Sequence, residues 1–417
     1  MTSADKIFPV TISINKHLNM WIMKKTLFFA VLLLGFFSTT AHAATVDRSN
    51  GFCLAQDGQN LYFSSPESMS FVVMDKTTGI LSFYKQPGSS DAGLNLGNAA
   101  VSLGETVLFS NSFGVHSYSK EGESITSLSQ MSVYTMAVSP EGSIWGGTAD
   151  HHVGMITSEG TFDAPLYIGH EDKYANSGNM HITDMQFGSD GTLWIVSVSD
   201  DRTTLYRVKD GSVELLPAPE GIPTGAQAVE IDGDGNVWYA TAHALVKYDG
   251  RDFTCYEVPS GMMPQGAKGI IQDFKFDDLG RIWILPLHGS IICAEDIEKG
   301  EYSYYEYEEV DAGSSTLDGM MYLAVDGATV YAVGGRLTEK TPYGISHQRA
   351  LLVTVKDGRA VCHEITENMA GSSPLGIGSV ETSGEKTSST LFDLQGRRLT
   401  QAPAKGVFIQ NGKKVTY

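Results

Sequence analysis

Short apolar stretches that alternate with polar residues recur along most of the chain, separated by turns that contain glycine. In one such unit, residues 182–187 alternate as a half-buried strand does, and a turn at Gly191 leads into a second apolar strand at residues 193–198. Two further stretches, residues 205–208 and 213–216, continue the pattern around another turn. The unit therefore predicts four antiparallel strands joined by tight hairpins.

This unit recurs seven times, and each copy carries an aromatic or apolar residue shortly after a turn glycine. The spacings between these residues are 46, 37, 49, 44, 45 and 48. The residues are Tyr62, Leu108, Trp145, Trp194, Trp238, Trp283 and Tyr331. Four-stranded repeats of that period are typical of propeller blades. The sequence therefore predicts an all-β protein, a seven-bladed β-propeller with four antiparallel strands per blade over residues 44–370, in which the Trp residues pack between blades.

The N-terminal region has the features of a secretory signal peptide. Lys24-Lys25 precedes an apolar run at residues 27–37, and Ala41-His42-Ala43 supplies small residues at a cleavage site. We expect a signal peptide at residues 23–43, cut after Ala43, with residues 1–22 an upstream mis-start. About 11 apolar residues are too few to span a bilayer. No later segment is long and apolar enough, so we expect no membrane span after signal cleavage.

Beyond the last repeat the composition changes twice. Residues 371–390 are rich in Gly, Ser, Thr and Glu and predict a linker. Residues 391–417 predict a small C-terminal β segment of two or three short strands, built around a Gln395-Gly396 turn and an Asn411-Gly412 hairpin.

Composition narrows the classes of partner. The formal net charge is −19, which weighs against nucleic acid and against an anionic membrane surface. The 4 cysteines form no CxxC pair, so a zinc site or a redox motif has no support. Export would permit disulfides, but scattered cysteines in a large domain are more often buried thiols. Pairing stays open among Cys53, Cys255, Cys293 and Cys362.

Two resemblances follow from these patterns. Repeats such as residues 229–241 (VEIDGDGNVWYAT) resemble the propeller repeats of bacterial two-component sensor ectodomains and of streptogramin lyase-like proteins, over most of residues 50–366. The tail, with LFDLQGRR at residues 391–398 and KGVFIQNGKK at 405–414, resembles the short sorting segment of proteins associated with type IX secretion. The lyase resemblance implies His and Glu residues that hold magnesium on one face. The second strands here lack the Glu that follows the lyases' Trp-Phe-Thr.

Strand order places one set of polar residues at a single mouth of the ring. The turns between second and third strands and the connections between blades share this face, and they carry several His residues. Asp184 and Asp273 each precede a Trp by ten residues, which predicts matching depths on inner strands. The candidate ligand-binding residues are His152, His181, Asp184, His243, Asp273 and His288. A divalent metal ion is the cofactor that imidazoles and carboxylates at one mouth would accept; no catalytic residue is assigned.

Two other motifs are weaker indications of a binding site. Asp232 to Asn236 imitates the start of a calcium loop, but its twelfth position is His243 rather than Glu. The tyrosines of residues 301–309 fit the outer strand of a blade as well as a sugar-stacking surface. The first hypothesis is an exported propeller, periplasmic, on the cell surface or extracellular, that binds a partner protein or a small polar ligand without catalysis. The alternatives are a metal-assisted lyase or lactonase at the same mouth, and a structural surface module.

Overall fold

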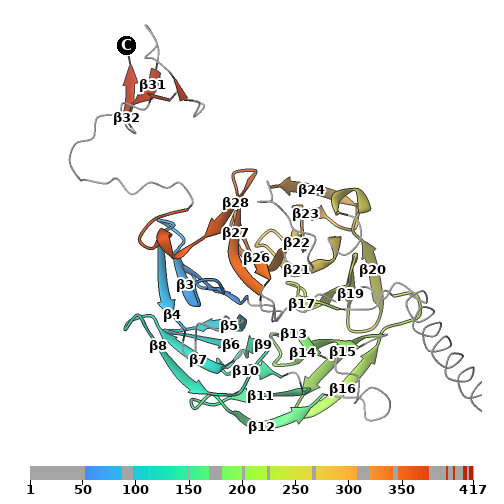
Figure 1. The fold of residues 1–417 in the computed structure, drawn as a ribbon. Helices are drawn as coiled ribbons and strands as arrows, with labels where there is room; N and C mark the ends of the chain where they lie inside the picture. The colour runs from blue at the N-terminus through green and yellow to red at the C-terminus, as the bar shows by residue number, and fades with distance from the viewer. Residues whose placement is uncertain are drawn as a thin grey trace, which may run out of the picture. The chain divides into compact units, whose positions relative to one another are not determined.

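The structure is a computed structural model (Figure 1), and it describes ten segments of the body together with four short strands of the C-terminal part. The segments are residues 52–86, 97–111, 113–148, 150–168, 181–199, 202–222, 226–264, 269–307, 319–340 and 346–374. The chain divides into two compact units, Met1–Ile377 and Gly378–Tyr417. The expected signal peptide, the residues before it and most of the expected linker lie outside the described residues.

Seven four-stranded antiparallel sheets follow one another along the described part of the first unit. Blades 1 to 4 consist of β1 (Leu54–Gln56), β2 (Asn60–Ser65), β3 (Ser70–Asp75) and β4 (Leu81–Lys85); β5 (Gly97–Leu103), β6 (Thr106–Asn111), β7 (Gly114–Ser119) and β8 (Ser124–Ser129); β9 (Thr135–Val138), β10 (Ile144–Gly147), β11 (His152–Ile156) and β12 (Phe162–Tyr167); and β13 (His181–Phe187), β14 (Leu193–Ser199), β15 (Arg202–Lys209) and β16 (Ser212–Pro217). Blades 5 to 7 consist of β17 (Ala228–Ile231), β18 (Val237–Ala240), β19 (Ala244–Tyr248) and β20 (Phe253–Glu257); β21 (Ile271–Phe276), β22 (Ile282–Pro286), β23 (Ser290–Asp296) and β24 (Glu301–Glu306); and β25 (Gly319–Asp326), β26 (Thr329–Lys340), β27 (Ser346–Lys356) and β28 (Arg359–Ile365). The prediction of an all-β, seven-bladed propeller is confirmed.

The first strand of each blade lies innermost in the ring. Each of these strands contacts the first strand of the next blade, from β1 and β5 around to β25 and β1. Figure 1 shows the sheets side by side, with their outer strands, such as β12 and β16, at the rim. Residues on the inner strands are therefore the ones that can face the central channel.

A side chain at the end of the first strand stabilises the turn between the first and second strands by accepting hydrogen bonds from the turn's backbone. In blade 5, Asp232 Oδ1 accepts the backbone N–H groups of Asp234 (3.0 Å) and Asn236 (2.8 Å). Gly235 has φ +86°, a left-handed conformation that glycine adopts without strain. The segment that imitates a calcium loop is thus a hairpin turn whose first carboxylate binds the turn's own backbone.

Apolar side chains pack mainly between neighbouring blades, and the Trp residues belong to these layers. Trp238 and Trp283 are each 4% exposed, in clusters shared with the next blade. Trp145 and Trp194 are only half-buried, although their rings contact Phe187 and Tyr248 of the next blade. The packing role between blades is confirmed for all four, and Trp145 and Trp194 are less buried than Trp238 and Trp283.

Each described blade is built from consecutive strands, so none borrows a strand from the other end of the chain. The joint between blades 7 and 1 is instead closed by edge contacts. Leu81 of β4 bonds to the segment after β28 through Ser372 O (3.1 Å) and the N–H of Gly371 (2.8 Å). Lys76–Asp326 (2.8 Å) and Arg349–Glu67 (2.6 Å) ion pairs lie across the same joint.

The remaining predictions concern cysteines, membrane helices and the tail. All four cysteines are free thiols; Cys53 and Cys293 are buried, and burial raises the pKa of each to about 12. Within the described segments, no helix has the length and hydrophobicity needed to cross a membrane.

The second unit contains β29 (Leu391–Phe392), β30 (Arg398–Leu399), β31 (Val407–Gln410) and β32 (Lys413–Thr416) in the order β30-β29-β31-β32. The expected small β segment is confirmed, with four strands rather than two or three.

Candidate functional site

The propeller presents two faces, which we name by the chain segments they carry. The turn mouth carries the hairpins between first and second strands. The connection mouth carries the turns between second and third strands and the connections from one blade to the next. Because neighbouring strands are antiparallel, these two sets of segments lie on opposite faces.

His152 lies at the connection mouth in a small group of polar and aromatic side chains. It is the first residue of β11 and is half-exposed, with its Nδ1 atom 3.4 Å from Asp150 Oδ2. Its ring centroid lies 5.5 Å from that of Tyr167, the last residue of β12, and the ring of His151 lies 6.2 Å from the same tyrosine. Tyr167 is 46% exposed. We call His151, His152 and Tyr167 the blade 3 patch.

The other predicted histidines occupy different environments. His243 is exposed in the turn between β18 and β19, and its backbone oxygen accepts the N–H of Val258 (3.0 Å). His288 is 4% exposed in the turn between β22 and β23. The backbone of His181 pairs with Val198 in blade 4, but its side chain lies outside the described part of the structure. Residues 170–180, which connect blade 3 to blade 4, also lie outside it.

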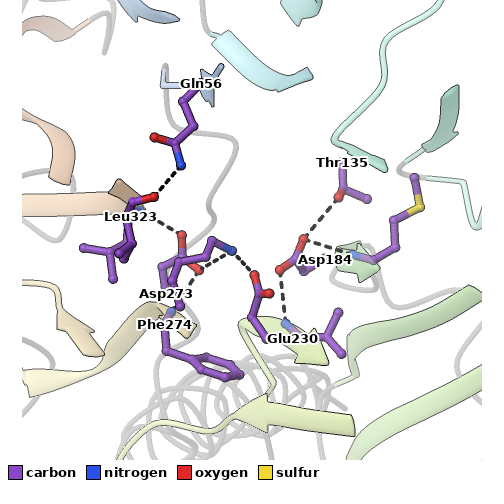
Figure 2. Close-up of polar contacts among 11 residues, drawn as sticks. Gln56, Thr135, Asp184, Glu230, Asp273, Phe274 and Leu323 are labelled. Atoms are coloured by element: carbon purple, nitrogen blue, oxygen red, sulfur yellow. Dashed lines mark hydrogen bonds and ion pairs between the residues drawn. The ribbon is translucent and has the colours of Figure 1, made fainter. Parts of the chain in front are cut away.

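Asp184 and Asp273 fasten their blades to the next ones (Figure 2). Asp273 accepts the N–H of Phe274 at Oδ1 (2.9 Å) and the N–H of Leu323, on blade 7, at Oδ2 (2.8 Å). Asp184 does the same in blade 4, with Met185 (2.9 Å) and with Val229 of blade 5 (3.1 Å). A register shift precedes each Asp in its strand, and such bulges re-aim side chains. The matching depths predicted for Asp184 and Asp273 thus reflect the same pair of backbone hydrogen bonds, formed once in blade 4 and once in blade 6. We call this pair of hydrogen bonds the clasp.

Two charged residues that the sequence analysis missed lie between these clasps. Glu230 of β17 forms an ion pair with Lys275 of β21, and the Lys275 ammonium also lies 3.5 Å from Asp273 Oδ1. Figure 2 shows Glu230 beside the clasp of Asp273, with Asp184 on its other side. The available signal was a lone charged residue between apolar neighbours on an inner strand, as in Val229-Glu230-Ile231.

Burial changes the acidity of this pair. Desolvation raises the pKa of Glu230 to about 7, although the nearby Lys275 ammonium acts in the opposite direction. Burial tends to lower the pKa of Lys275, but Asp273 and Glu230 outweigh it and hold that pKa above the ordinary value. The group therefore holds one firmly protonated ammonium and one carboxyl group that titrates near neutrality.

The six predicted site residues do not form one metal site in the described part of the structure. Across those segments, no three His, Cys, Asp or Glu side chains are grouped so that they could hold a metal ion. The carboxylates of Asp184 and Asp273 accept backbone N–H groups, whereas His152 and His243 lie at the surface of separate blades. In the described segments, these side chains therefore do not converge on one point.

Comparisons with known proteins give similarities in structure only. No protein-family model matches the chain, and no curated protein sequence matches it. The extracellular domain of a hybrid two-component system from B. thetaiotaomicron is 13% identical, with a TM-score of 0.47, over 75% of this chain and 47% of that one. The WD40 β-propeller domain of Doa1 is 16% identical, with a TM-score of 0.46, over 65% of this chain and 83% of that one. Hydrazine synthase of Kuenenia stuttgartiensis is 13% identical, with a TM-score of 0.45, over 65% and 80%. This chain thus spans about half the length of the sensor domain, and its seven-bladed fold is established by its own strand pairing.

Proposed function

We propose that this protein is an exported, non-catalytic propeller that binds a partner protein at its connection mouth, with the blade 3 patch in the contact. The observation that carries the proposal is the half-exposed Tyr167 ring flanked by two imidazoles. Tyr is enriched among the residues that dominate protein interfaces, because it buries a large rigid ring and keeps a hydrogen-bonding group. Loops on a rigid scaffold are also where binding residues concentrate.

A second exposed aromatic residue supports the same face. Phe113 is 37% exposed and lies between β6 and β7 of blade 2, a turn of the connection mouth next to blade 3. The two are the exposed large aromatic residues of the described connection mouth. Tyr304, which is also exposed, lies in the outer strand β24. An interface that extends over blades 2 and 3 would bury both rings.

Support for binding in place of catalysis comes from the inner carboxylates. A general acid or base must reach its substrate through a free oxygen. Both Asp184 and Asp273 already accept two backbone N–H groups each, one of them from the next blade. These carboxylates serve the joints between blades, and the third inner carboxyl group, that of Glu230, is paired with Lys275.

Export is the second element of the proposal, and residues 23–43 carry it. The basic pair, the apolar run and the Ala-His-Ala site are the features that signal peptidase substrates share. Mass spectrometry of the extracytoplasmic protein should give Ala44 as the first residue. An intact Met1 or Met23 on protein recovered from that fraction would contradict export by this route.

The binding proposal is tested by capture with matched variants. The purified mature protein, the double variant His152→Ala/Tyr167→Ala and the control Tyr304→Ala are each immobilised and exposed to the extracytoplasmic fraction of the native host. Quantitative mass spectrometry should find a protein retained by the wild type and by Tyr304→Ala and lost from the double variant. Equal retention by all three would place the interface elsewhere, and capture of a small polar ligand alone would replace the partner protein.

A further inference from the structure

Six of the seven blades place an aromatic ring at one position of the second strand. The rings are Tyr62, Trp145, Trp194, Trp238, Trp283 and Tyr331. Each packs toward the following blade: the ring centroid of Tyr62 lies 6.1 Å from that of Tyr118 in blade 2, and that of Trp238 lies 5.8 Å from Phe276 in blade 6. An aromatic ring between blades is thus a regular part of this propeller.

Blade 2 lacks this ring, and it also lacks the Asp that accepts a hydrogen bond from the ring in three other blades. Leu108 of β6 stands where the other blades have the ring. In blades 1, 5 and 6 an Asp at the end of the first strand accepts a hydrogen bond from the ring, as Asp57 does from the Tyr62 hydroxyl (2.7 Å). In blade 2 the corresponding residue is Leu103. In blade 2, aliphatic side chains therefore replace both the aromatic ring and the Asp that accepts its hydrogen bond.

A groove lies between blades 2 and 3 at this place, at the turn mouth. Its volume is about 440 Å³, within the range of small-molecule sites. The apolar walls are Leu103, Leu108 and Leu128 from blade 2 and Ile144, Met155 and Ile156 from blade 3. Serine and threonine hydroxyls, among them Thr106 and Ser117, complete the lining. No charged side chain lines it, although the protein carries a formal charge of −19.

We propose that this groove binds a small uncharged molecule through an aromatic ring. The ring would lie against Leu108 and Met155, where the other blades of the propeller hold a ring of their own. The lining offers no charged group that could pair with an ionised ligand, so it favours an uncharged one. The hydroxyl groups offer hydrogen bonds to a polar substituent on the ring. This site lies on the face opposite the blade 3 patch, and it does not depend on the proposed partner-binding function.

The test uses indole as the probe and two variants of the full mature protein. Ligand-observed NMR should show indole binding with a dissociation constant on the order of 1 mM, as expected for so small a ligand. Leu108→Trp places an indole ring in the groove and should weaken binding by about tenfold or more. The control Leu279→Trp adds the same side chain to an exposed turn of blade 6, at the same mouth, and should bind indole as the wild type does.

Two further probes test the chemical class, and a second variant covers a folding failure. Cyclohexanol and benzoate should each bind about tenfold more weakly than indole, because one lacks the aromatic ring and the other is charged. Met155→Trp fills the groove from blade 3 and should have the effect of Leu108→Trp. In a crystal soaked with bromoindole, the bromine should lie between Leu108 and Met155. The proposal is overturned by wild-type affinity in either filled variant, by cyclohexanol binding as tightly as indole, or by no indole binding up to about 10 mM.

Discussion

The indole Nε1–H of Trp238 donates a hydrogen bond to Oδ2 of Asp232 at 2.8 Å, which links the packing residue of blade 5 to the carboxylate that ties its hairpin turn. Trp283 and Asp277 repeat the arrangement in blade 6 at 3.0 Å. In blades 3 and 4 the residues corresponding to Asp232 are Ser139 and Gly188, which offer no carboxylate. The two Trp residues with an Asp partner are the buried ones.

This difference predicts unequal effects of Trp substitution. Trp238→Ala and Trp283→Ala should each reduce the free energy of unfolding by about 3–5 kcal/mol, because each removes a buried ring and its hydrogen bond. Trp145→Ala and Trp194→Ala should cost clearly less, since those rings are only partly buried. Urea unfolding of the four variants gives the comparison. Equal losses at all four positions would mean that burial of the ring does not set its contribution.

The clasp between blades predicts a second effect on stability. Asp273→Ala leaves the buried N–H of Leu323 without the acceptor it now has, and should cost about 2–3 kcal/mol. Asp234→Ala is the matched control, because Asp234 is exposed at a turn tip, and it should change stability by no more than about 0.5 kcal/mol. If Asp273→Ala unfolds at the same urea concentration as Asp234→Ala, the clasp is not a structural bond.

The sequence predicted the features that depend on residues close together in the chain, and it did not predict those that depend on residues far apart in it. Turn glycines and the ring that follows each lie within a few residues of one another, so blade number and strand order were predictable. The equal depth of Asp184 and Asp273 followed from their spacing to Trp194 and Trp283. Their acceptor role was not predictable, because the donors lie 45 and 50 residues away on another blade.

The same limit applies to the charged pair and to the histidines. Glu230 and Lys275 are 45 residues apart and meet only because inner strands of neighbouring blades are adjacent. Strand direction predicted that the turns with His152, His243 and His288 share a face. It could not show that His288 is buried and His243 exposed, because this depends on how each turn packs.

The raised pKa of Glu230 predicts a pH dependence of stability with a definite sign. The folded protein holds this proton up to about pH 7, whereas the ordinary value is 4.5, so the folded state binds more protons between these values. The contribution of Glu230 to stability is therefore present below pH 4.5 and declines as pH rises to 7. Relative to Glu230→Gln, the wild type should lose roughly 2–3 kcal/mol between pH 4.5 and 7.5.

Urea unfolding of both proteins at several pH values provides the measurement. Taking the difference between wild type and Glu230→Gln removes the contributions of other titrating groups that the two proteins share. A difference that stays constant, or that favours the wild type as pH rises, would show that the pKa of Glu230 is not raised in the folded protein.

Metal analysis separates the proposed function from the metal-assisted lyase or lactonase. The binding account predicts no stoichiometric divalent metal in the purified mature protein by plasma mass spectrometry. A stoichiometric metal that disappears in the variant His152→Ala/His243→Ala/His288→Ala would favour the lyase. Because His288 is buried, that variant must be compared with His288→Ala alone, which should itself lower the melting temperature. His152→Ala/His243→Ala should melt close to the wild type.

If a partner protein contacts the connection mouth at blade 3, site-specific photo-crosslinking should capture it there. A photoreactive phenylalanine analogue is introduced at Tyr167 in one protein and at Tyr304, on the outer strand of blade 6, in another. On irradiation in the native host, position 167 should give one discrete crosslinked protein that is absent from position 304. No crosslink at 167, or the same product from both positions, would contradict this contact.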